Sequence, residues 1–200
     1  MAATYLQLTN ELLRELNEVA LTSANFSSAI GIQQHVKDCI NRAYLDIVNE
    51  EPQWPFLAVA TSGDTDPFYG NTYVETTAGT RWYELKPSAS SLVDDYGYVD
   101  WDNFYITTIG VTGATEPYTS RNLRYITVEE FKDFHRAEEN NDDATSQNWG
   151  EPRRVFKSPD NRKFGLSPIP DDTYRVWFYA YVLQTELSEF SDQIVIPNIY

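Results

Sequence analysis

The sequence predicts an α+β protein with an N-terminal helical hairpin plus an antiparallel β-sandwich or barrel-like domain that has a C-terminal β-meander. Apolar residues recur at three- and four-residue steps over the first fifty positions, which is typical of amphipathic helices. From Trp54 onward they occur in short runs rich in Val, Thr and Tyr between turn residues, which is typical of strands. The expected division is a helical hairpin at 1–53, an antiparallel β region at 54–126, a helix at 127–139, an acidic loop at 140–150, and a β-meander with a tail at 151–200.

The first two helices are expected to share one buried face. Residues 9–20 are predicted to form the first helix, with Thr9 as its N-cap. Its apolar stripe consists of Leu12, Leu16 and Val19. A longer helix is predicted to begin after a cap at Ser27 or Ser28 and to end near Glu50. Its stripe consists of Ile32, Val36, Cys39, Ile40, Ala43 and Ile47.

The remaining elements are mostly strands. Those expected before residue 127 are Phe56–Thr61, Thr72–Thr77, Thr80–Leu85, Phe104–Val111 and Leu123–Ile126. Turn residues at Gly63-Asp64 and Ala78-Gly79 separate the first three of them. Thr127 and Glu130 have the spacing of a capping box, which predicts the helix that follows.

Three further strands are expected in the last third of the chain, at Arg153–Lys157, Arg162–Leu166 and Thr173–Leu183. Both faces of the last of these are apolar. We therefore expect it to be buried on both sides, either within the domain or against a neighbour.

Composition excludes several classes of protein. The 200 residues include 15 basic and 30 acidic side chains, a formal net charge of −15, which argues against a non-specific nucleic-acid binder and against an anionic membrane surface as partner. The chain is 42% hydrophobic and 14% aromatic, which argues against disorder. No signal peptide and no transmembrane segment is expected.

The residue types that perform catalysis or bind metals lack the spacing of a known site. Cys39, the only cysteine, is expected to be a buried core thiol. His35 and His135 are expected to be surface or capping residues, and Asp64 with Asp66 only faintly resembles a calcium loop. The paired carboxylates are expected to lie in turns or to face solvent, at Asp94-Asp95, Asp142-Asp143 and Asp171-Asp172. We predict no enzyme activity, no cofactor and no metal.

One basic cluster is a candidate interface. It contains five of the 15 basic residues within one predicted hairpin, namely Arg153, Arg154, Lys157, Arg162 and Lys163. The cluster is either a solvated hairpin or a docking site for an acidic surface such as a neighbouring copy, whose loop at Glu138–Asp143 is one candidate. Nucleic acid is a weaker third interpretation, because the rest of the chain repels phosphate.

The linear order of the segments resembles a known family. The resemblance rests on EEPQWPFL at 50–57, WYELKP at 82–87, LRYITVEEF at 123–131, FGLSPIPDDTY at 164–174, and the later Tyr181, Leu187, Asp192 and Ile196-Pro197. This order is similar to that of the head-to-tail adaptor proteins of tailed bacteriophages, also called tail tubular protein A in short-tailed phages. In that family a helix normally follows the Ile-Pro-x-x-Tyr segment. Because this sequence ends at Tyr200, that helix is expected to be shortened, absent or missing from the sequence.

The resemblance implies a structural protein of the virion that assembles in the host cytoplasm. Its expected partners are its own copies in a ring of about twelve, the portal protein, and the tail nozzle or tail tube protein, with no membrane partner. Genomic DNA would pass through the bore without specific binding, and the acidic charge fits a bore that does not hold phosphate.

Two other interpretations remain open. One is a different phage neck or tail component, for tail completion or fibre attachment. The other is a carbohydrate-binding or carbohydrate-active domain, since five Trp and fourteen Tyr accompany many carboxylates. The adaptor interpretation predicts aromatic residues in the core, whereas the sugar interpretation predicts exposed Trp beside a cleft with two carboxylates.

Overall fold

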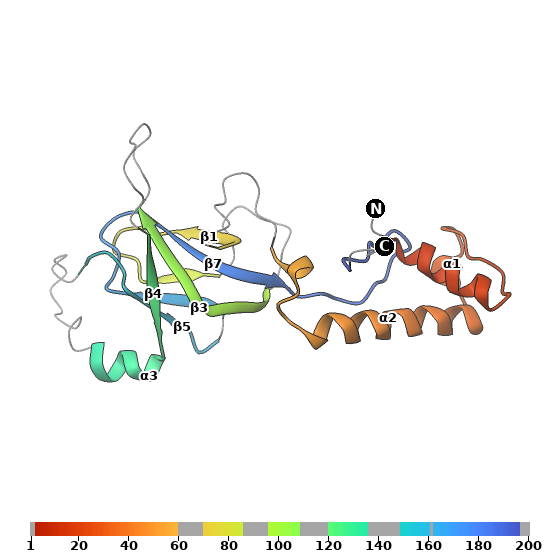
Figure 1. Cartoon of the computed structure of the whole chain (residues 1–200), viewed down its shortest axis with the longest axis horizontal. Helices are drawn as coiled ribbons and strands as arrows, with labels where there is room; N and C mark the ends of the chain where they lie inside the picture. The colour runs from red at the N-terminus through yellow and green to blue at the C-terminus, as the bar shows by residue number, and fades with distance from the viewer. Residues whose placement is uncertain are drawn as a thin grey trace, which may run out of the picture. The chain divides into compact units, whose positions relative to one another are not determined.

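The chain divides into two compact units, as a computed structural model shows (Figure 1). The helical unit comprises Met1–Leu57 and Leu183–Tyr200, and the β-unit comprises Ala58–Val182. The structure describes residues 3–59, 70–85, 96–108, 120–135, 149–160 and 162–196. Several predicted features lie outside these residues, namely the Gly63-Asp64 turn, Asp64 with Asp66, the Asp94-Asp95 and Asp142-Asp143 pairs, the side chain of His135, and the acidic loop up to residue 148.

Helix α1, Tyr5–Glu15, begins four residues before the predicted start. The N-cap is Thr4, whose side chain accepts from the Gln7 backbone while the Gln7 side chain accepts from the Thr4 backbone. This reciprocal capping box satisfies two backbone donors, so the predicted cap at Thr9 is wrong. Thr9 lies inside the helix, where its buried hydroxyl donates to the Tyr5 carbonyl at 2.8 Å.

Helix α2, Ile32–Glu50, has Gly31 at its N-cap, with a φ of 60° that favours glycine. Ser27 and Ser28 do not cap it, because they belong to the separate 3₁₀ turn η1, Phe26–Ser28. The buried face of α2 also differs from the prediction. It consists of Val36, Lys37, Tyr44 and Val48.

The buried face contains Lys37 and Tyr44 because each has an apolar body and a polar tip with a partner. The Lys37 ammonium donates to the Phe26 carbonyl at 3.0 Å and lies 4.2 Å from the centre of the Phe26 ring. Tyr5 donates to the Lys37 carbonyl at 2.9 Å, and burial raises the pKa of Tyr5 to about 12. Cys39 is exposed, so the predicted core thiol is wrong.

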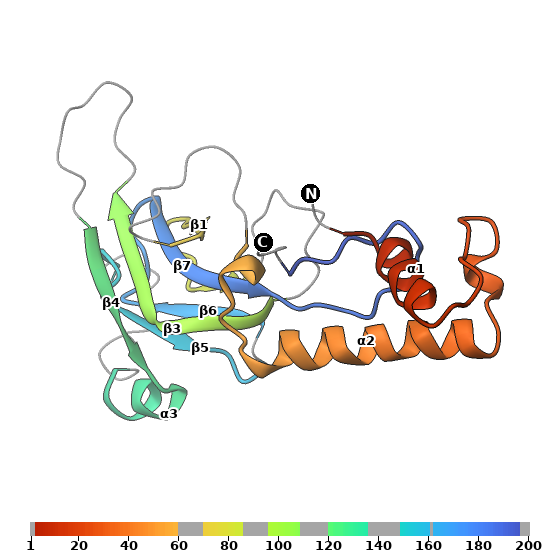
Figure 2. The same cartoon turned by 45° about the vertical axis from the view of Figure 1, so that its right-hand side comes forward.

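A C-terminal strap, defined as Leu183–Ile196, belongs to the helical unit (Figures 1 and 2). The Asn41 side chain holds it by donating to the Leu187 carbonyl and accepting from the Leu187 amide, both at 2.9 Å. Tyr44 donates to the Gln184 side chain at 3.0 Å. The Tyr5 amide donates to the Asp192 carbonyl at 2.9 Å. Backbone and side-chain hydrogen bonds therefore attach the strap to both helices.

The described residues of the β-unit form one seven-stranded sheet in the order β1-β7-β3-β4-β5-β6-β2. The strands are β1 Thr72–Glu75, β2 Trp82–Glu84, β3 Tyr96–Thr108, β4 Ser120–Ile126, β5 Arg154–Lys157, β6 Lys163–Ser167 and β7 Tyr174–Val182. Every pair is antiparallel except β4 with β5, which is parallel. The α+β class is confirmed. The C-terminal meander is limited to the β5–β6 hairpin, because β7 pairs with β1 and β3.

Some predicted boundaries also differ. Residues 55–57 form the 3₁₀ turn η2, Pro55–Leu57, instead of the start of a strand. Up to residue 59, where this described range ends, an isolated bridge from Ala58 to Tyr181 follows. Strand β3 begins at Tyr96, earlier than predicted. Thr127 caps α3, Val128–Glu130, which continues as the π-helical turn η3, Phe131–His135. The residues after 135 in the predicted helix lie outside the described part of the chain.

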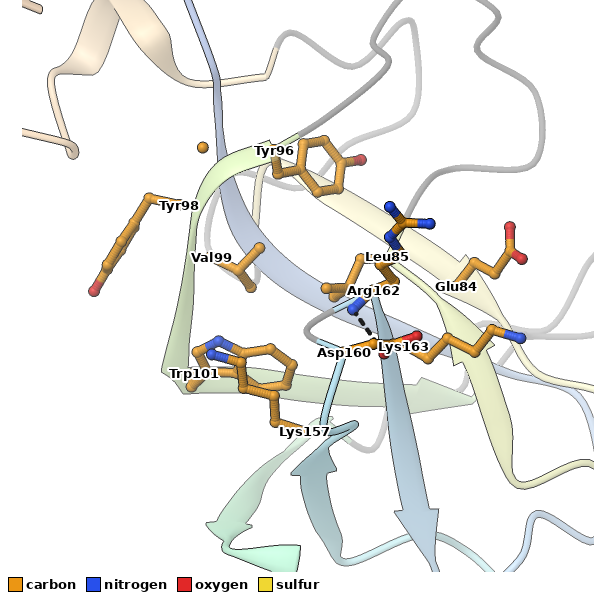
Figure 3. A pocket seen from close by; sticks show the side chains of 11 residues that line it. Glu84, Leu85, Tyr96, Tyr98, Val99, Trp101, Lys157, Asp160, Arg162 and Lys163 are labelled. Carbon is orange, nitrogen blue, oxygen red and sulfur yellow. Dashed lines mark hydrogen bonds between the residues drawn. The ribbon is translucent and has the colours of Figure 1, made fainter. Parts of the chain in front are cut away.

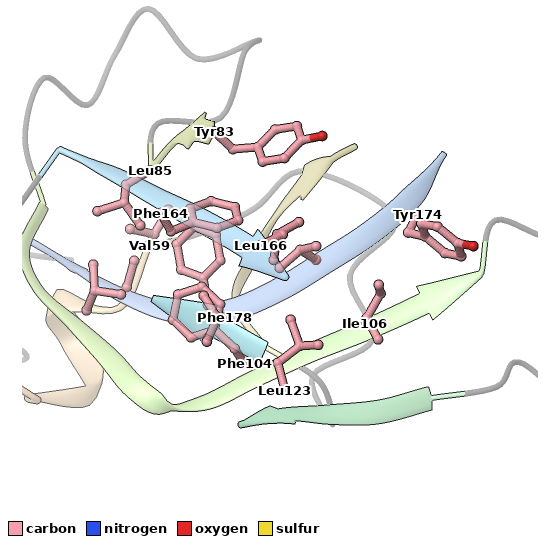
Figure 4. Close-up of a cluster of buried hydrophobic side chains, with 14 residues drawn as sticks. Val59, Tyr83, Leu85, Phe104, Ile106, Leu123, Phe164, Leu166, Tyr174 and Phe178 are labelled. Atoms are coloured by element: carbon pink, nitrogen blue, oxygen red, sulfur yellow. The ribbon is translucent and has the colours of Figure 1, made fainter. Parts of the chain in front are cut away.

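The core of the β-unit is built around three phenylalanine rings (Figure 4). Phe104 of β3 stacks on Phe178 of β7 at 5.0 Å between centroids, and Phe164 of β6 lies 5.7 Å from Phe104 and 6.0 Å from Phe178. The middle of β7 is buried on both faces, as predicted. Trp177, on the face opposite Phe178, is also buried and donates to the Thr107 hydroxyl at 2.9 Å.

We predict that Asn41→Asp lowers the free energy of unfolding of the helical unit by about 1–3 kcal/mol. The carboxylate cannot donate to the Leu187 carbonyl, which then lacks its partner. Urea denaturation followed by far-UV circular dichroism measures the change. Asn49→Asp is the matched control, since it adds the same charge at an exposed position of α2. Equal stability of the two variants would contradict the role of Asn41.

Candidate functional site

The five residues of the predicted basic cluster do not form one patch. In the β5–β6 hairpin Arg154 pairs with Ser167, whereas Lys157 pairs with Phe164 nearer the turn. The two ends of β5 are therefore roughly 10 Å apart along the strand. Arg153 and Arg154 lie at one end, where β4 places Arg124 beside Arg154.

The other three basic residues line a pocket of about 810 Å³ in the β-unit (Figure 3). We call it the basic pocket. Its walls come from the end of β2, the first half of β3 and the turn end of the β5–β6 hairpin. The side chains around it are those of Glu84, Leu85, Tyr96, Tyr98, Val99, Trp101, Lys157, Asp160, Arg162 and Lys163.

Hydrogen bonds within the hairpin turn fix its conformation, and this conformation positions the three basic residues. The Asp160 carboxylate accepts from the Ser158 hydroxyl and from the Arg162 amide. The Ser158 hydroxyl accepts from the Lys163 amide at 3.0 Å, and the Ser158 amide donates to the Lys163 carbonyl at 2.9 Å. The hydrogen bond from Ser158, with that from the Arg162 amide, lowers the pKa of Asp160. Asp160 is thus an ionised part of the turn.

The cations of the basic pocket are available for a partner. Within the described ranges, no carboxylate forms a salt bridge with Lys157, Arg162 or Lys163. The Lys157 ammonium lies 5.5 Å from the centre of the Trp101 ring, which stacks on Phe104 at 5.2 Å. The pocket therefore combines positive charge with an aromatic wall, an arrangement suited to a carboxylate beside an apolar group.

Asp160 of the pocket lacks one property of a glycosidase's general acid. The pocket contains a Trp and two carboxylates, as the sugar interpretation predicts, but a general acid needs a raised pKa and that of Asp160 is lowered. Trp82 and Trp149 are exposed, at 42% and 41%, and neither lines the pocket. The core of the β-unit instead contains Phe104, Phe164 and Phe178.

The other candidate residues form no catalytic or metal site that the structure describes. His35 and Cys39 are exposed on α2 with 3.7 Å between Nε2 and Sγ. Asp171 accepts from the Tyr174 hydroxyl at 2.7 Å and Asp172 accepts from the Thr173 amide at 2.7 Å, so this pair has the predicted turn role. In the described ranges no three His, Cys, Asp or Glu side chains gather as a metal site. No helix among these residues is long and apolar enough to cross a membrane.

Sequence analysis missed a second candidate surface, an apolar stripe on α2. We define the α2 stripe as Ile32, Cys39, Ala43 and Ile47. Spacings of seven and four residues place these side chains on one face of a helix. Ile32 and Ile47 are 44% and 43% exposed, and Cys39 and Ala43 are also exposed. An exposed row of apolar side chains is a candidate interaction site. The signal was present in the sequence as the predicted stripe, but it was assigned to the core.

We predict that Cys39 in the folded monomer reacts completely with a water-soluble thiol reagent without prior unfolding, because its side chain is exposed. Val36→Cys combined with Cys39→Ser is the matched control, since it moves the thiol to the buried face of the same helix. That thiol should react at least about 100-fold more slowly, because it requires local opening. A Cys39 thiol that reacts as slowly as the control thiol, measured by absorbance under native conditions, would place Cys39 in the core after all.

One comparison with known proteins bears on these surfaces. The model of the family described as SU10 adaptor protein matches residues 3–200, nearly the whole chain. No curated protein matches it. The family match spans the α2 stripe, the strap and the basic pocket together.

Proposed function

The chain belongs to the SU10 adaptor protein family, so it is a structural component of a bacteriophage particle, and we propose that it is the head-to-tail adaptor. In this proposal it forms a closed ring of about twelve copies between the portal protein and the tail nozzle or tail tube. Genomic DNA passes through the bore. The observation that carries the proposal is the family match over nearly the entire chain.

The α2 stripe supports assembly into a ring. A closed ring uses heterologous contacts, in which one surface of a subunit meets a different surface of the next. The exposed side chains of Ile32 and Ile47 are apolar area that the described parts of the helical unit leave uncovered. Burying them against a neighbour removes this area from water, at roughly 25 cal/mol per Å².

Charge supports passage of DNA without binding. With a net charge of −15 the subunit repels phosphate overall, and a non-specific DNA binder needs an extended basic face. We propose that the five basic residues contact protein instead, either a neighbouring copy or the portal. They are Arg153, Arg154, Lys157, Arg162 and Lys163. The proposed role requires no catalysis and no cofactor.

We predict that Ile47→Asp weakens ring assembly on the portal protein at least about tenfold, because a buried, unpaired carboxylate replaces an apolar contact. Native mass spectrometry of the chain mixed with its portal measures the effect. Asn49→Asp, which adds the same charge to the same helix, should assemble as the wild type does. Since Ile47 is exposed in the monomer, its own folding should be unchanged.

We also predict that reversing Arg153 and Arg154 to Glu weakens assembly with the neighbour or portal. Unchanged assembly at physiological salt would remove these two residues from the interface.

A chain that binds other neck or tail proteins but forms no ring on a portal would contradict the adaptor proposal. It would favour a tail-completion or fibre-attachment role.

A further inference from the structure

We propose that the basic pocket of one copy receives the acidic C-terminal strap of the next copy in the ring. This inference rests on the proposed ring and names the partner of one of its surfaces. The partner is a second copy of this chain, because the chain itself contains a segment whose charge and apolar groups match the pocket.

The pocket presents three cations, none of which forms a salt bridge with a carboxylate in the described ranges. Lys157, Arg162 and Lys163 line it, whereas Asp160 is engaged by the turn. Figure 3 shows the side chain of Lys157 beside Trp101. A partner with carboxylates next to an apolar side chain would pair with the cations and cover the aromatic wall.

The strap has this chemistry. Residues 183–196 contain three acidic residues and no basic one. Glu186 and Glu189 are exposed, whereas Asp192 accepts from the amides of Ser188 and Glu189 at 2.7 and 2.8 Å. Phe190, directly after Glu189, is 38% exposed. Two carboxylates and a phenyl ring are thus available to a neighbour.

The hydrogen bonds within the helical unit present the strap in a fixed conformation. Asn41 holds Leu187, and Asp192 closes the turn that contains Glu189. The backbone that carries the exposed carboxylates therefore loses little conformational freedom on docking, which favours affinity. Because the pocket belongs to the β-unit and the strap to the helical unit, the contact joins different surfaces of two subunits, as a ring requires.

Nucleic acid fits the pocket less well than the strap does. A duplex is bound by a row of basic residues that follows its backbone. The basic pocket instead holds three cations in one hollow, with Glu84 and Asp160 also lining it. Its aromatic wall is an independent reason to favour a peptide segment with an apolar side chain.

The test uses two full-length variants that are each defective alone. The pocket variant carries Arg162→Glu and Lys163→Glu, and the strap variant carries Glu186→Lys and Glu189→Lys. All four side chains are exposed, so both monomers should unfold at the wild-type urea concentration. Each variant alone should assemble on the portal at least about tenfold more weakly than the wild type in native mass spectrometry.

Mixing the two variants in equal amounts should restore the ring. In an alternating ring every reversed pocket meets a reversed strap, and every wild-type pocket meets a wild-type strap. A strap that docked on its own copy would give no such rescue. The four substitutions in a single chain should also restore assembly. In the control, the pocket variant is mixed with a variant that carries Glu11→Lys and Glu15→Lys, at exposed positions on α1. These substitutions compensate the net charge but do not complement the reversed pocket. They should therefore not restore the ring.

Three results would overturn the inference. The first is a pocket variant that assembles like the wild type, which leaves the adaptor proposal intact. The second is rescue by the α1 control, which would assign the effect to net charge alone. The third is binding of a short DNA duplex by the wild-type chain but not by the pocket variant, when mixing with the strap variant does not restore assembly. A wild-type chain that forms no ring on its portal would instead contradict the proposed function itself.

Discussion

The contact between Phe164 and Phe178 constrains the whole β-unit. Their strands, β6 and β7, are separated by three others in the sheet order, so in a flat sheet they would lie roughly 19 Å apart. The two ring centroids are 6.0 Å apart. Only a strongly curled sheet brings them together, and Figure 4 shows the strands surrounding these rings. The curl also places the first half of β3 opposite the β5–β6 turn, where the basic pocket lies.

Asparagine side chains supply backbone-like pairing where no strand does. Asn41 pairs with both polar groups of Leu187, Asn10 does the same with Leu21, and Asn71 with Ala180. An amide has the donor and the acceptor of a peptide unit, so it satisfies a segment that runs without a neighbouring strand. The strap and the loop after α1 are both held in this way. In each segment, one side chain thus satisfies both polar groups of a residue.

Local patterns in the sequence predicted well which segments form helices and strands. They predicted poorly which face of a helix is buried. The strand signals around Tyr73, Tyr83 and Val176 and the cap at Thr127 are local, and the structure has strands and a helix there. The buried face of α2 was wrong because Lys37 and Tyr44 are buried through partners at Phe26 and Gln184, which are distant in sequence. Of the six apolar residues that were predicted to face the core, Val36 is buried and Ile40 is half-buried, whereas the other four form the exposed α2 stripe.

The candidate interface shows the same limit. Composition identified the basic hairpin, but strand register decided which of its residues share a surface. Arg154 and Lys157 lie at opposite ends of β5, and Lys157 lies near Trp101 of β3. The strap could not be predicted as a binding element from local sequence. Its conformation depends on Asn41, which lies 146 positions before Leu187.

The helical unit is completed by a segment that follows the β-unit in the chain. During synthesis the ribosome therefore makes every residue of the β-unit before it makes Leu187 or Ile194, both of which are buried in the helical unit. Domains generally fold as their residues emerge. The order of translation thus delays completion of the helical unit until the β-unit has been made. A nascent chain therefore lacks the C-terminal strap until the whole β-unit has been made.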